Sequence, residues 1–161
     1  MGYYFLQNGE EWFQMVKSGE MLIGQYCSKV SPKGRVAFPK KFRDQMGDQL
    51  VVTRGYEGCL IVVSENDWKL LLEGTENKPF VFEATRDTLR FLLGNAAQVE
   101  LDEQGRFVLA IHLRNYSGLE QGAVFLGLQK YVEIWDKKRW ADRQNYLSKN
   151  INQISERLGN N

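Results

Sequence analysis

The chain has 161 residues, of which 43% are hydrophobic, and its 21 Lys and Arg nearly balance its 20 Asp and Glu. This length fits one compact domain or two small interlocked ones, and the apolar share excludes wholesale disorder. The formal net charge of +1 neither favours nor excludes a nucleic-acid partner, so only the distribution of charge is informative. There is no apolar run of membrane-helix length, no signal-peptide pattern and only two cysteines, Cys27 and Cys59. These features predict a soluble cytoplasmic protein.

A diverged internal repeat is the most informative feature of the sequence. Gly34-Arg35 recurs as Gly105-Arg106, and Trp68 recurs as Trp140 after a one-residue insertion. Further pairs keep the same order: Arg43 with Arg114, Gly47 with Gly118, Gly55 with Gly127, Val30 with Leu101, Val36 with Phe107, Phe38 with Leu109, and Phe42 with Leu113. The repeat predicts two copies of one small β-rich module.

The first copy alternates short strands with turn and helix signals. In chain order we expect a strand over 25–30, a turn over 31–34, a strand over 35–38, a helix over 39–46, and strands over 49–53 and 59–63. Pro39 suits the first turn of that helix, and Gly47 suits its end. Ser64 and Asp67 resemble a capping box that opens a further helix up to residue 72.

The second copy repeats this pattern after a polar connection over 74–79 and a short helix over 85–93. Its expected elements are strands over 99–101, 106–110, 123–126 and 131–135, with a short helix that ends at Gly118. Asp136 then caps a final helix with an apolar stripe formed by Trp140, Leu147, Ile151, Ile154 and Leu158. We expect this stripe to dock on the body of the protein or on a neighbour. Residues 1–20 match neither copy, and 8–19 could form one short helix.

The patterns of enzymes fit this sequence poorly. The single histidine, His112, has no nucleophile motif around it, and one His with two scattered Cys offers no metal cluster. No P-loop or dinucleotide fingerprint is present. Asp102 and Glu103 could pair as catalytic carboxylates, but turn chemistry explains them better. We therefore expect no catalysis, cofactor or metal.

Positive charge is concentrated in the first copy. Residues 27–43 contain six cations and no acid, whereas the matching residues 98–114 contain Arg106 and Arg114 against three acids. The six cations are Lys29, Lys33, Arg35, Lys40, Lys41 and Arg43. A charge run is often only a solvated surface, but these cations bracket a turn and the start of the following helix. Both can meet one DNA groove, where Lys and Arg contact phosphates and base edges.

Four stretches together are similar to one known family. They are residues 31–35 (SPKGR), 90–96 (RFLLGNA), 102–106 (DEQGR) and 132–136 (VEIWD). In this order they resemble the MraZ family, a bacterial branch of the AbrB-like swapped-hairpin DNA-binding proteins, over about residues 21–143. The resemblance implies a nucleoid-associated regulator of the division and cell-wall gene cluster, its own promoter included. It also implies two AbrB-like modules with interleaved hairpins, ring-shaped homo-oligomers, and binding to double-stranded DNA at direct repeats.

The family pattern D-x-x-x-R identifies the DNA-contacting candidates. The second copy keeps it as Asp102 and Arg106, whereas the first has Ser31 in place of the Asp and retains Arg35. If the Asp only caps the turn, Ser substitutes more weakly. If the Asp also pairs with the arginine, Arg35 is freer than its counterpart. The resemblance carries over Arg35 and Arg106, and the charge pattern adds the five other cations of residues 27–43.

We thus expect a mainly β protein with short helices (α+β), made of two tandem modules and a C-terminal helix. The expected segments are an extension over 1–20, modules over 21–72 and 96–139, a linker with a short helix over 73–95, and a helix over 140–161. The expected function is sequence-specific DNA binding, most simply as a repressor. The alternative is an antitoxin-like or protein-interaction module that uses the same fold, since the long C-terminal helix could grip a partner.

Overall fold

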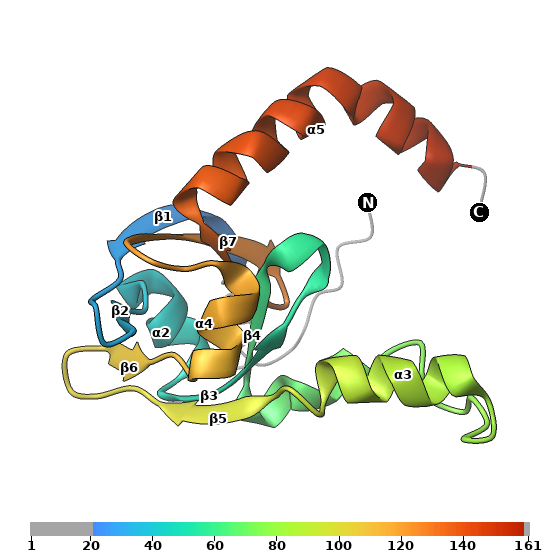
Figure 1. Ribbon diagram of the computed structural model, residues 1–161, viewed down its shortest axis with the longest axis horizontal. Helices are drawn as coiled ribbons and strands as arrows, with labels where there is room; N and C mark the ends of the chain where they lie inside the picture. Colours follow the sequence, from blue (N-terminus) through green and yellow to red (C-terminus); the bar gives the residue numbers. More distant parts are fainter. Residues whose placement is uncertain (1–20, 160–161) are drawn as a thin grey trace, which may run out of the picture.

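The computed structural model describes residues 21–159, so the expectations for residues 1–20 lie outside it. Short strands alternate with short helices, and one long helix follows (Figure 1). The strands are β1 (Leu22–Lys29), β2 (Arg35–Ala37), β3 (Gln49–Arg54), β4 (Leu60–Ser64), β5 (Ala97–Glu100), β6 (Arg106–Val108), β7 (Gly122–Gln129) and β8 (Val132–Asp136). The helices are α2 (Lys40–Met46), η1 (Tyr56–Gly58), η2 (Glu65–Leu72), α3 (Glu83–Leu92), α4 (Ile111–Ser117) and α5 (Lys137–Leu158).

The two copies are interleaved in one antiparallel sheet with the strand order β1-β7-β8-β4-β3-β5. Strand β1 of the first copy pairs with β7 of the second, and β5 of the second copy pairs with β3 of the first. The equivalent strands β4 and β8 pair at the centre. The strand order is therefore pseudo-symmetric: each strand of one half of the sheet has its equivalent, from the other copy, at the same place in the other half. The two β-rich copies expected from the repeat, and the swapped-hairpin arrangement that the family resemblance implies, are confirmed.

The core is formed jointly by both copies, because β1 and β5 each pair with a strand of the other copy and not with their own. Phe42 of α2 and Phe125 of β7 are fully buried in it. Phe38 meets the Phe125 ring edge-to-face at 5.6 Å between centroids, and Tyr26 meets Phe42 in the same way at 5.0 Å. Edge-to-face packing suits the charge distribution of aromatic rings. The apolar residues matched by the repeat, such as Phe42 and Leu113, are equivalent core positions.

Local capping signals are confirmed at the expected residues. The Ser64 hydroxyl accepts a hydrogen bond from the Asp67 amide at 3.1 Å and donates to the Asp67 carboxylate at 2.6 Å. The helix that follows, η2, is a 3-10 helix and not an α-helix. Gly47 and Gly118 end α2 and α4, and each amide donates to a carbonyl of the preceding helix. Asp136 caps α5 by accepting from the amides of the first helical turn.

Helix α5 contacts the sheet only near its start and then extends away from it (Figure 1). Trp140 packs on Trp135, with 5.6 Å between ring centroids, and donates from Nε1 to the Gln25 side chain at 3.2 Å. Beyond that point the helix has no buried residue; Ile151 is 51% exposed and Leu158 is 78% exposed. The apolar stripe is therefore left open along most of its length. No helix among residues 21–159 is long and apolar enough to cross a membrane.

Candidate nucleic-acid interface

Strands β2 and β6 form a separate two-stranded ribbon that joins the two copies. Its central pair, Val36 and Phe107, is buried against the core. Because side chains alternate along a strand, the flanking Arg35 and Arg106 lie on the opposite, outer face of the ribbon. Arg35 opposes Val108 in the register, so the two arginines are diagonal neighbours. A two-stranded ribbon of this kind fits the major groove of DNA.

Each arginine follows a tight turn of the same construction. In the first turn (residues 31–34), the Gly34 amide donates to the Ser31 carbonyl at 2.8 Å, and the Arg35 amide donates to the Ser31 hydroxyl at 3.0 Å. In the second turn (residues 102–105), the Asp102 carboxylate accepts the corresponding bond from the Arg106 amide at 2.9 Å. Ser31 therefore caps its turn in the way that the Asp of the family pattern does.

The two guanidinium groups differ. Nε of Arg106 donates to the Asp102 carboxylate at 3.0 Å. Hydrogen bonds from the backbone amide and the guanidinium of Arg106 hold the pKa of Asp102 below its usual value. No carboxylate of residues 21–159 pairs with Arg35. In the second turn the Asp therefore both caps the turn and pairs with the arginine. Ser31 supplies only the cap, and no carboxylate in the described part of the chain neutralises Arg35.

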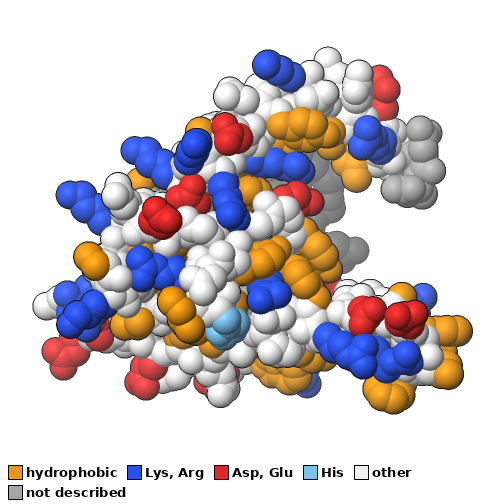
Figure 2. All heavy atoms as spheres, viewed as in Figure 1, with side chains coloured by type: hydrophobic (Ala, Val, Ile, Leu, Met, Phe, Trp, Pro, Cys, Tyr) orange, Lys and Arg blue, Asp and Glu red, His pale blue; other side chains and the backbone are white. Residues whose placement is uncertain are grey.

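The other cations divide into exposed and engaged groups. Lys29, Lys33 and Lys41 are exposed. Lys40 is also exposed but pairs at 2.8 Å with Asp44, which lies just beyond the acid-free stretch. Arg43 is half-buried, and its guanidinium lies against Gly105 of the second turn. Figure 2 shows several Lys and Arg side chains, with acids among them, at the end of the molecule where Figure 1 places β2 and β6.

The features that could suggest enzymatic chemistry have structural explanations. His112 lies in the first turn of α4, exposed, with Nε2 3.0 Å from the Asn95 carbonyl. Asp102 belongs to the second turn, as expected from turn chemistry. Within residues 21–159 no group of three or more His, Cys, Asp and Glu side chains could hold a metal ion.

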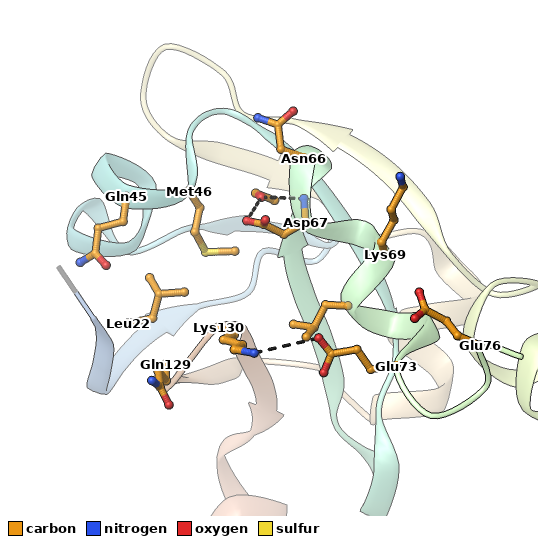
Figure 3. Close-up of a pocket in the computed structure, with 12 residues that line it drawn as sticks. Leu22, Gln45, Met46, Asn66, Asp67, Lys69, Glu73, Glu76, Gln129 and Lys130 are labelled. Atoms are coloured by element: carbon orange, nitrogen blue, oxygen red, sulfur yellow. Dashed lines mark hydrogen bonds and ion pairs between the residues drawn. The ribbon is translucent and has the colours of Figure 1, made fainter. Parts of the chain in front are cut away.

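A cavity of about 580 Å³ lies between the start of β1, the end of α2 and η2, away from the two turns (Figure 3). Its lining includes apolar Leu22 and Met46, while Lys130 pairs across it with Glu73 at 4.0 Å. Lining charges of both signs offset one another. The cavity therefore offers no single-sign field to a charged ligand.

The sequence analysis missed one residue of the interface, Arg114. Its side chain donates to the Pro32 carbonyl at 2.8 Å, in the first turn of the other copy. The signal that could have identified it is its equivalence to Arg43, one of the cations singled out in the first copy. Its partner, 82 positions away in the chain, could not be found without the three-dimensional pairing of the copies.

These features define a double AbrB-like swapped-hairpin protein. Its two hairpin copies are interleaved, share one six-stranded sheet, and form a ribbon that carries one arginine from each copy. The family model described as "MraZ protein, putative antitoxin-like" matches residues 21–91 and again residues 92–161. The chain belongs to the MraZ family.

Named relatives agree with this assignment. The chain is 36% identical to the transcriptional regulator MraZ of Caldanaerobacter subterraneus subsp. tengcongensis over 87% of its own length and 98% of the relative's. It is 33% identical to the protein of the same name from Syntrophomonas wolfei and 36% identical to that from Thermoanaerobacter pseudethanolicus, in both cases over 86% of this chain and 96% of the relative. The similarity thus covers both copies.

Proposed function

We propose that the protein is a sequence-specific, DNA-binding transcriptional regulator without catalytic activity or cofactor. The observation that carries this proposal is the outer face of the β2–β6 ribbon, where Arg35 and Arg106 lie side by side on a diagonal. Exposed Lys33 in the first turn and exposed Lys29 at the end of β1 add positive charge beside it. Arginines on a ribbon can donate to guanine edges in the major groove, while the lysines contact phosphates and fix the register.

The target proposed is the protein's own promoter, at the start of the division and cell-wall gene cluster, with repression as the simplest outcome. The names of the relatives support a role in transcription, and the choice of target rests on what the resemblance to the family implies. Such a protein would be associated with the nucleoid. Footprinting on the DNA upstream of its gene tests the proposal, and we expect protection of direct repeats. Protection without preference for repeated sites would contradict it.

We further propose that the chain assembles beyond a dimer, as a ring. Two apolar surfaces support assembly: the open stripe of α5, and the consecutive residues Phe80, Val81 and Phe82, which are 76%, 74% and 57% exposed. Figure 2 shows apolar side chains on both of these projecting parts of the molecule. Large exposed apolar patches commonly mark protein contacts. Assembly would also join many weakly cationic subunits into one DNA-binding body and increase affinity through avidity.

Light scattering on the purified protein tests the assembly directly. We expect a mass above that of a dimer at micromolar concentration, and a monomer or a dimer would refute the proposal. A polar variant of the stripe, such as Ile151→Asn with Leu158→Asn, should lower the mass because both side chains lie open to solvent in the single chain.

The alternative is an antitoxin-like module that holds a protein partner. The open stripe of α5 and the words "putative antitoxin-like" in the family's description both favour it. Purification from its own cells separates the two functions. A stoichiometric protein partner would support the antitoxin-like function, whereas recovery that depends on DNA would support the regulator.

A further inference from the structure

Arg114 of α4 connects the two copies at the first turn. Its Nη1 donates to the Pro32 carbonyl at 2.8 Å, and its Nε donates to the Leu119 carbonyl of its own copy at 3.0 Å. The guanidinium is thereby fixed at two points in a plane. Its stem and Nη1 also lie 3.5 Å from the place that a Cβ would take on Gly34. One side chain of the second copy thus covers the turn that presents Arg35.

The repeat places Arg43 in the equivalent position on the second turn. The Arg43 guanidinium lies so close to Gly105 that a Cβ there would be 2.5 Å from its Nη1. Gly34 and Gly105 both have left-handed φ angles, +80° and +72°. Glycine permits this backbone conformation in both turns, and at Gly105 it also leaves room for the close approach of the other copy's arginine.

The two turns do not depend equally on this contact. Asp102 accepts three hydrogen bonds within its own turn, from the Gln104 amide and from the amide and guanidinium of Arg106. Ser31 accepts only one through its side chain, from the Arg35 amide. A hydroxyl is also a weaker acceptor than a carboxylate. The side chains of the first turn itself make fewer hydrogen bonds to its backbone, so a larger share of the restraint on its conformation must come from Arg114.

We infer that Arg114 is a positioning residue, which holds the first turn of the other copy in the conformation that presents Arg35. Arg43, whose guanidinium packs against Gly105 of the second turn, is assigned the equivalent role there and not a DNA contact. The inference rests on the proposed function where DNA is concerned, but its structural part can be measured without DNA.

Amide hydrogen exchange on the full-length protein measures the structural part. In Arg114→Ala we expect the Gly34 and Arg35 amides to exchange about tenfold faster, as a local opening that leaves the rest of the sheet protected. Arg43→Ala is the matched control, with the same charge change at the equivalent position. It should speed exchange at Gly105 and Arg106 and leave the first turn unchanged, with a smaller effect because Asp102 remains. If Arg114→Ala does not unfold cooperatively, Arg114→Lys, which keeps the stem and the charge, takes its place.

Titrations with duplex DNA from the region upstream of the gene measure the functional part. We expect Arg114→Ala to weaken binding about tenfold, and its effect to disappear in the background of Arg35→Ala, because both act through one turn. In the background of Arg106→Ala, by contrast, Arg114→Ala should still weaken binding about tenfold, because Arg106 belongs to the other turn. Two exchange results in Arg114→Ala would overturn the inference: unchanged exchange rates at Gly34 and Arg35, or a uniform rise in rate across the chain. In the titrations, losses of affinity from Arg35→Ala and Arg114→Ala that multiply in the double variant would also overturn it. If the wild type does not bind this DNA, the proposed function fails, and the exchange data alone decide the role of Arg114.

Discussion

Arg35→Ala and Arg106→Ala should have different effects, although the repeat makes the two residues equivalent. The Arg35 guanidinium has no carboxylate partner within residues 21–159, and exposed Lys33 lies beside it in the sequence. Arg106 is engaged by Asp102 at 3.0 Å, and Glu103 adds a second acid to its turn. Only Nε of Arg106 is engaged, so its terminal nitrogens can still donate, but the carboxylates of Asp102 and Glu103 weaken its attraction to DNA phosphates. Arg35 can meet DNA directly.

The expected size of the effect follows from the contact that is lost. An arginine that donates to a base edge contributes about 1–3 kcal/mol, so Arg35→Ala should weaken operator binding by roughly 5- to 150-fold. Each cation that contacts a phosphate changes the slope of log K against log salt by about 0.9. Removal of Arg35 should thus also flatten the salt dependence if it contacts a phosphate. Arg106→Ala should leave the slope nearly unchanged and show its cost in stability or assembly.

Fluorescence anisotropy at two salt concentrations measures both quantities, and light scattering and thermal unfolding establish that each variant is folded and assembled. Equal losses of affinity in two variants that both remain folded and assembled would refute the asymmetry. Ser31→Asp provides a converse test. It places a carboxylate where Asp102 stands in the other copy, so it should engage Arg35 and weaken DNA binding, whereas Asp102→Ser should release Arg106 and strengthen it.

Three further predictions concern the remainder of the chain. Burial raises the pKa of the Cys59 thiol, and nearby Glu133 raises it further, whereas Cys27 is exposed. A thiol reagent should therefore label one cysteine in the native protein and two after unfolding. Double labelling of the native protein would contradict the burial of Cys59. Burial also raises the pKa of Glu133, whose carboxylate accepts a hydrogen bond from Trp135 at 2.8 Å. The Glu133→Gln variant keeps a hydrogen-bond acceptor without the buried charge. The melting temperature of this variant should therefore exceed that of the wild type at neutral pH. That advantage should shrink as the pH falls through the raised pKa, because the wild-type carboxyl is then protonated too, and a constant difference would contradict the explanation. Deletion of residues 1–20 should leave cooperative unfolding and DNA binding intact, because both copies and the whole sheet lie within residues 22–136; lost binding would place the boundary elsewhere.

Sequence reasoning succeeded where the interaction is local and failed where it crosses the copies. The caps at Ser64 and Asp136 were predictable because donor and acceptor lie within three residues of each other. The equivalence of the two turns was also predictable, since Gly and Arg recur at a fixed spacing. In contrast, the bond from Arg114 to Pro32 requires knowledge that β2 pairs with β6. The ion pair of Lys40 with Asp44 is a local contact between residues four apart, but Asp44 lies just beyond the acid-free residues 27–43.

The crossed arrangement explains how the first turn can keep its shape without the Asp of the family pattern. A turn that relied only on its own side chains would lose two hydrogen bonds when Asp is replaced by Ser, namely those that Asp102 accepts from the Gln104 amide and the Arg106 guanidinium. The first turn retains the cap through Ser31 and receives an outside restraint from Arg114. The backbone is thus held while the Arg35 guanidinium is released. Because the two copies are joined in one chain, such a change can occur in one turn only, which a symmetric dimer of single modules could not achieve.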